Sequence, residues 1–130
     1  MKKLLKIKAA CAATALWYVA GGVDEEAILR LSLAHGFTTK DGMADEDWLK
    51  VAALLGIKTR ATLAEPILLG KFIKKHAVGL YLVGTFDHLF VVDNGIIFDP
   101  RGKKPPGLKR KLHQAWKVVV ERKRPLDKAE

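Results

Sequence analysis

The stretch DHLFVVDNGIIFDP, residues 87–100, determines the fold that we expect for this chain. Two short apolar runs flank Asn94-Gly95, which is the strongest short-range signal for a two-residue type I′ turn. The stretch therefore predicts a β-hairpin, in which each apolar run is one strand.

The turn type also fixes which residues face each other. With a two-residue turn, Val92 lies opposite Ile97 and Phe90 lies opposite Asp99. Opposed residues share a face and side chains alternate along each strand. His88 and Asp99 then become diagonal neighbours on one face, close enough to hydrogen-bond. A three-residue loop would shift the register by one and separate them.

The rest of the chain changes from helical to strand patterns. We expect helices over residues 9–20, 24–36, 45–56 and 66–76, and further strands in VGLYLVG and AWKVVVERK. Asp24 and Asp45 are the expected caps of the second and third helices, and Pro66 suits the first turn of the fourth. This order predicts an α+β fold, with N-terminal helices packed on a small antiparallel sheet.

We expect one domain over residues 1–130, with a basic loop and terminal strand at 101–124 and a short polar tail at 125–130. The net charge is +9, and residues 101–130 hold 11 Lys or Arg against 3 Asp or Glu. Such a segment can bind nucleic acid or an acidic protein partner, or it can be merely solvated. The candidate partner-binding residues are Lys103, Lys104, Lys109, Arg110 and Lys111.

Cys11 is the only cysteine, which excludes an intrachain disulfide and fits a reducing, cytoplasmic setting. A small buried hydrophobe is the common role of such a residue. Residues 1–20 also have the basic start and apolar run of a secretory signal, so export with their removal is the alternative. Lys6 and Lys8 interrupt that run, which is too short to span a membrane, so we expect no integral membrane segment.

Several kinds of site lack support in the sequence, and we expect no cofactor. The four histidines are scattered, and one cysteine cannot make a structural zinc site. Ser32 is the only serine and lies inside an expected helix, which argues against a serine triad. No glycine-rich phosphate loop follows a strand.

A cysteine nucleophile has more support. Thiols attack as thiolates, and both a helix N-terminus and a neighbouring imidazolium favour that form. Cys11 lies near the start of the first expected helix. His88 could accept its proton and Asp99 could orient the imidazole ring. Spacing alone does not bring Cys11 to His88, because the helix must first pack its N-terminus against the sheet.

These motifs resemble those of compact papain-like cysteine peptidases, particularly the bacterial and phage groups similar to the bacteriocin-processing peptidases. The matched features are CAATAL at residue 11, the hairpin stretch, and HGF and LGI at helix ends, over roughly residues 5–100. The resemblance implies a papain-like fold and a peptide or protein substrate. It also implies that Cys11 is the nucleophile, His88 the general base and Asp99 the orienting acid.

One departure from the family pattern bears on activity. Such enzymes usually carry a glutamine about six residues before the cysteine, as a donor to the oxyanion, and this chain has Leu5 there. Its only glutamine is Gln114, far along the sequence. Losing one such donor typically costs about 10²–10³ in turnover. Two hypotheses follow: a peptidase that cleaves a peptide or isopeptide bond, or a weak or inactive relative that binds through its basic C-terminal segment.

Overall fold

The computed structural model describes residues 10–22, 24–38, 42–85, 88–99 and 107–119. The helices are α2 (Cys11–Val19), α3 (Glu25–Ala34), α4 (Asp45–Leu54) and α5 (Leu69–Lys75). The strands are β1 (Lys58–Ala61), β2 (Ile67–Leu68), β3 (Leu80–Gly84), β4 (Leu89–Asp93), β5 (Ile96–Phe98), β6 (Lys111–Leu112) and β7 (Gln114–Val119). Helices and antiparallel strands together confirm the expected α+β class.

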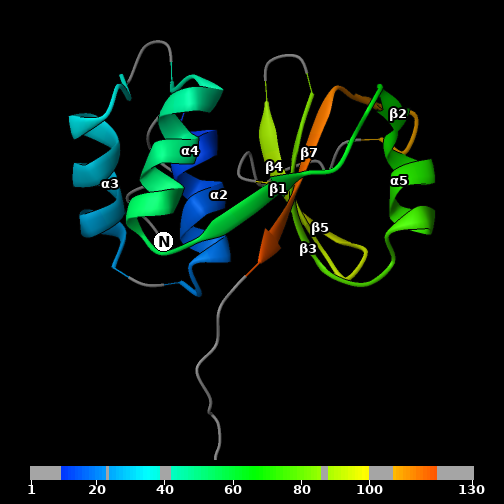
Figure 1. Ribbon diagram of the computed structural model, residues 1–130, viewed down its shortest axis with the longest axis horizontal. Coiled ribbons are helices and arrows are strands. Elements are labelled where there is room, and N and C mark those ends of the chain that lie inside the picture. The colour runs from blue at the N-terminus through cyan, green and yellow to red at the C-terminus, as the bar shows by residue number, and fades with distance from the viewer. Residues whose placement is uncertain (1–9, 23, 39–41, 86–87, 100–106, 120–130) are drawn as a thin grey trace, which may run out of the picture.

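The main sheet has five strands in the order β1-β7-β3-β4-β5, and all neighbours are antiparallel. The last described strand, β7, therefore lies between β1 and β3. A separate pair is formed by β2 and β6. Helices α2, α3 and α4 lie on one side of the main sheet, and α5 lies on the other side with β2 (Figure 1).

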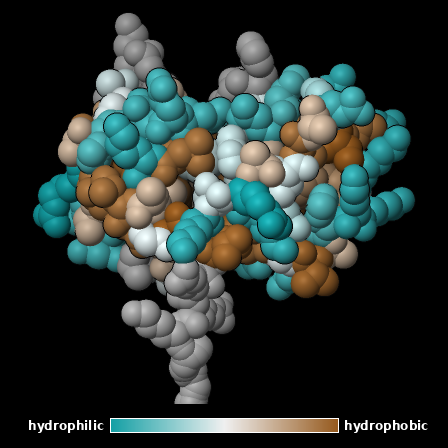
Figure 2. Space-filling view, viewed as in Figure 1, coloured by the Kyte–Doolittle hydropathy of each residue, from teal (hydrophilic) through white to brown (hydrophobic). Residues whose placement is uncertain are grey.

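Each side of the sheet has its own core. Leu89 and Val91 of β4 pack with α2 and α4, while Phe90 and Val92 pack with α5. Because both faces of β4 are covered, the strand reads as a continuous apolar run instead of an alternating one. In Figure 2, hydrophilic residues cover much of the left and right edges of the molecule, where α3 and α5 lie in Figure 1.

Helix α2 packs against β4, and three of its buried side chains are alanines. Ala12, Ala13 and Ala15 are all buried, with relative exposures of 5% or less. Below them the rings of Trp48 and Trp116 meet edge to face, with centroids 4.7 Å apart. Small side chains allow close approach of the helix backbone to the sheet, which fixes the position of its first turn.

The hairpin has the predicted turn and register. Asn94 and Gly95 have φ angles of 49° and 82°, as a type I′ turn requires. The ladder pairs Val92 with Ile97, as expected. Two hydrogen bonds join Asn94 of the turn to Gly79, just before β3. The Asn94 side-chain oxygen accepts from the Gly79 N–H at 2.7 Å, and the Asn94 N–H donates to the Gly79 carbonyl at 2.8 Å.

Two of the three expected helix starts need correction. Asp24 does cap α3, since its carboxylate accepts from the Glu26 N–H at 2.9 Å. Asp45 was expected to cap α4, but Ala44 is the N-cap and Asp45 is the first helical residue. Pro66 does not start α5, because Ile67 and Leu68 first pair with β6 and the helix begins only at Leu69.

Some strands were not predicted. β1 carries a polar sequence without alternation, and β6 begins at Lys111, the last residue of the expected basic loop RGKKPPGLKRK. β7 overlaps the expected strand AWKVVVERK but begins one residue earlier, at Gln114. The remaining parts of the expected loop, strand and polar tail, at 101–106 and 120–130, lie outside the described residues, as do residues 1–9 of the alternative signal sequence.

Tyr18 ties the last turn of α2 to the hairpin. Its hydroxyl donates to Asp93 Oδ2 at 2.8 Å, and its ring stacks on Phe98 with centroids 4.4 Å apart. Tyr18→Phe is expected to lower the free energy of unfolding by about 1 kcal/mol, because one partly exposed hydrogen bond to a carboxylate is lost. Urea denaturation at neutral pH measures the difference.

The pH dependence of this difference is a second measurement. The hydrogen bond to Asp93, together with burial and the nearby negative charge, raises the pKa of Tyr18. A raised folded pKa means that the stabilisation is present below the ordinary tyrosine value and is lost as pH rises through the folded pKa. The gap between wild type and Tyr18→Phe should therefore shrink at strongly alkaline pH. Equal midpoints at neutral pH would contradict the role assigned to this bond.

Candidate functional site

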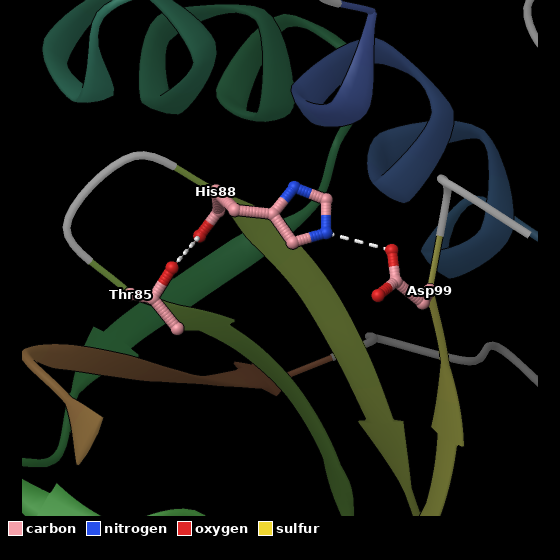
Figure 3. Close-up of polar contacts among 3 residues, drawn as sticks. All are labelled: Thr85, His88 and Asp99. Carbon is pink, nitrogen blue, oxygen red and sulfur yellow. Dashed lines mark hydrogen bonds and ion pairs between the residues drawn. The ribbon is translucent and has the colours of Figure 1, made fainter. Parts of the chain in front are cut away.

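A histidine and an aspartate meet at the end of the hairpin strands. His88 lies just before β4 and Asp99 just after β5. The His88 Nε2 donates to Asp99 Oδ1 at 2.6 Å, and the two side chains are 3% and 6% exposed (Figure 3). The contact predicted from the type I′ register is thus confirmed. Since a carboxylate only accepts, this bond puts the proton on Nε2 and makes Nδ1 the basic nitrogen of the neutral ring.

The backbone on the other side of His88 is fixed as well. The Thr85 N–H donates to the His88 carbonyl at 2.9 Å, and the Thr85 hydroxyl lies 3.5 Å from the same oxygen. Figure 3 shows this contact on the side of His88 away from Asp99. The His88 ring also stacks on Phe90, with centroids 5.7 Å apart. The position of the ring is therefore fixed by three contacts: the hydrogen bond of the His88 carbonyl, the stacking on Phe90 and the Nε2 bond to Asp99.

Cys11 is brought to the same place by α2. It is the first residue of that helix, is half-buried and carries a free thiol. Cys11 and His88 both line a pocket of about 370 Å³. In Figure 3 the start of α2, drawn in blue, passes above the His88 ring. The packing that the sequence left open, with the helix N-terminus at the sheet end that carries His88, is the one observed.

The first turn of α2 suits an anionic sulfur. It contains no acidic side chain. The first N–H groups of a helix have no acceptor within the helix, and its N-terminus carries partial positive charge. A thiolate, or an oxyanion beside the sulfur, is favoured there.

Gln114 is the functional candidate that the sequence did not assign to the site. It begins β7 and lines the pocket with Cys11 and His88. In the ladder Gln114 pairs with Gly84, and Gly84 pairs with Leu89. Gln114, Gly84 and Leu89 therefore lie in one row across β7, β3 and β4.

Gly84 lies between Gln114 and Leu89 in this row. A Cβ added there would lie 3.8 Å from the Trp116 ring and 4.0 Å from Leu89 Cδ1, both of which pack on the α2 side of the sheet. Gly84 itself lines the pocket together with Gln114 and His88. Because side chains alternate along β7, Gln114 lies on the same face of the sheet as Trp116. This face lies at the pocket because β7 pairs with β3. Leu5, where the family pattern has glutamine, lies outside the described residues.

The candidate partner-binding residues do not join this pocket. Lys109, Arg110 and Lys111 are exposed, and Lys103 and Lys104 lie outside the described residues. The Arg110 carbonyl accepts from the Leu69 N–H at 2.8 Å, at the start of α5. This basic segment thus lies on the α5 side of the sheet, and its partner-binding role stays a prediction.

Within the described ranges, no group of three or more His, Cys, Asp or Glu side chains is arranged to hold a metal ion. None of the helices in those ranges is long and apolar enough to cross a membrane.

Comparisons with known proteins add no relative. No family model, no curated protein and no solved structure matches the chain. The site must therefore be interpreted from its own geometry.

Proposed function

We propose that this protein is a cysteine hydrolase of papain-like fold, which cleaves a peptide or isopeptide bond through a thioester on Cys11. The observation that carries the proposal is the buried hydrogen bond between His88 and Asp99, at a pocket that also contains the thiol at a helix N-terminus. A nucleophile, a base and a group that orients the base are the three parts that such chemistry requires.

Each residue has one task in the proposed reaction. His88 Nδ1 takes the proton of the Cys11 thiol, and the sulfur attacks the carbonyl carbon. When the tetrahedral adduct collapses, the same nitrogen gives its proton to the leaving amine and the thioester remains. Water then attacks the thioester with His88 again as base, which releases the acid and restores the thiol. Asp99 holds the required tautomer and stabilises the imidazolium.

The developing oxyanion needs two donors, and the glutamine usual before the cysteine is replaced by Leu5 in this sequence. We assign one to the Cys11 backbone N–H, at the start of α2. The second is the side-chain amide of Gln114, which lines the same pocket. Support for this assignment comes from the ladder, which pairs Gln114 with Gly84, another residue that lines the pocket.

The setting follows from the chemistry. A hydrolase of this type needs its single thiol reduced, so we place it in a reducing cytoplasm, bacterial or of a host cell, with a peptide or protein as substrate. Removal of residues 1–20 would delete α2, whose side chains make up much of one core.

Acylation of Cys11 tests the proposal. The full chain is mixed with p-nitrophenyl acetate at neutral pH, and phenolate release is followed together with the intact mass. We expect Cys11 to acetylate at least about tenfold faster than a small free thiol and then to lose the acetyl group to water, because the base and the oxyanion donors act on both steps. Cys11→Ala is the control and should show no burst.

A slow reaction would contradict the proposal. If Cys11 acetylates no faster than the free thiol while the protein is folded, the arrangement does not activate the sulfur, and the binding hypothesis gains support.

A further inference from the structure

We propose that the pocket selects substrates with a positive charge beside the bond to be cleaved, and that Asp45 is the residue that receives this charge. A lysine or arginine side chain is the natural source in a peptide. This inference rests on the proposed function, since it names the substrate class of the same site.

Asp45 is the first residue of α4 and lines the pocket together with Cys11 and His88. Among the other described residues that line it, none is Lys, Arg or Glu. The carboxylate therefore provides the negative charge that a bound group meets on the α4 side. Met43 and Leu89, which also line the pocket, offer apolar surface for the aliphatic part of a long cationic side chain.

The carboxylate is held in a fixed position. Its Oδ1 accepts from the Trp48 indole N–H at 2.7 Å. Trp48 is only 1% exposed and packs edge to face against Trp116, so the indole that donates this bond is itself fixed in place. One indole N–H uses one of about four lone-pair sites of a carboxylate, so further acceptor capacity remains for a ligand.

The helix itself does not require Asp45 to be charged. Glu46 and Asp47 already place negative charge in the first turn of α4, and Ala44 is the N-cap. Trp48 requires an acceptor but not an anion, and an asparagine oxygen would serve it. Neither the start of α4 nor the Trp48 bond therefore depends on the charge at residue 45, which is available to a cationic ligand.

Methanethiosulfonate reagents test the inference, because Cys11 is the single thiol of the chain. The thiolate attacks the thiosulfonate sulfur, a disulfide forms, and methanesulfinate leaves. Rates are measured for the cationic aminoethyl and the neutral methyl reagents, and each rate is divided by that of a small neutral thiol. For wild type we expect a cation-to-neutral ratio about three- to tenfold above one, from one fixed charge that lines the same pocket as the thiol.

Two matched variants isolate the charge. Asp45→Asn keeps an oxygen for Trp48 and should bring the ratio close to one. Glu46→Gln removes the same charge from the adjacent exposed residue, which does not line the pocket, and should leave the ratio unchanged. If Asp45→Asn fails to fold, the wild-type protein alone still tests the inference. Because salt screens the attraction between charges, the wild-type ratio should fall toward one in about 1 M salt.

An Asp45→Asn ratio equal to that of wild type would overturn the inference, as would a wild-type ratio that is insensitive to salt. The ratio also separates this inference from the proposed function. If neutral reagent reacts no faster than with a free thiol while the ratio still depends on Asp45, the hydrolase proposal fails and the cation preference of the pocket stands.

Discussion

Replacing His88 with alanine is expected to slow acetyl transfer to Cys11 by about 10²–10⁴-fold, the usual contribution of a positioned general base. The reason is geometric. The Asp99 bond fixes the ring with Nδ1 as its basic nitrogen, in the pocket that holds the thiol. The measurement is the burst rate with p-nitrophenyl acetate at neutral pH.

This variant also disturbs a buried pair, and removing one member of such a pair costs about 3–5 kcal/mol. The folded fraction must therefore be determined by circular dichroism before rates are compared. Added imidazole should restore part of the rate if the lost function is a base, whereas a merely structural role would not respond. His35→Ala is the matched control, because His35 is half-buried at the end of α3 and does not line the pocket.

The outcome that counts against the assignment is specific. If His88→Ala is folded and acetylates as fast as wild type, His88 is not the base, and the bond to Asp99 serves only to close the hairpin end.

Replacing Gln114 with alanine is expected to lower kcat by about 10²–10³-fold with little change in KM, because an oxyanion donor acts mainly in the transition state. Gln114 is exposed at the start of β7, so the variant should keep its stability within about 0.5 kcal/mol. Steady-state hydrolysis of the p-nitrophenyl ester gives both constants.

Val119→Ala, at the exposed far end of the same strand, serves as the control and should leave both constants unchanged. A Gln114→Ala variant that hydrolyses the ester like wild type would remove the amide from the mechanism. The Cys11 backbone N–H would then be the single donor assigned.

The part of the site that could be predicted is the part that depends on local geometry. Asn94-Gly95 sets a type I′ turn, and the turn alone fixes the register that brings His88 to Asp99. No knowledge of the rest of the chain is needed for that contact. Helix α3 was predicted for the same reason, since its cap at Asp24 is a local signal.

Most of the missed features depend on pairing between distant segments; the N-cap of α4 at Ala44 is the local exception. β1 has few apolar residues and is a strand only because β7 pairs with it. Ile67 and Leu68 read as a helix start after Pro66, but β6 extends them. Gln114 was too far along the chain to be linked to Cys11, and the insertion of β7 beside β3 removes that separation.

The construction of the pocket has a consequence for the order of events during synthesis. The thiol is on α2, the first helix of the described residues. Its base lies just before β4, the orienting acid just after β5, and the amide donor at the start of β7. Contacts between such distant segments form slowly, because the intervening chain must be closed into loops first. A nascent or partly folded chain therefore exposes an ordinary thiol, and reactivity arises only once β7 has inserted. Reactivity of Cys11 would thus report that folding is complete.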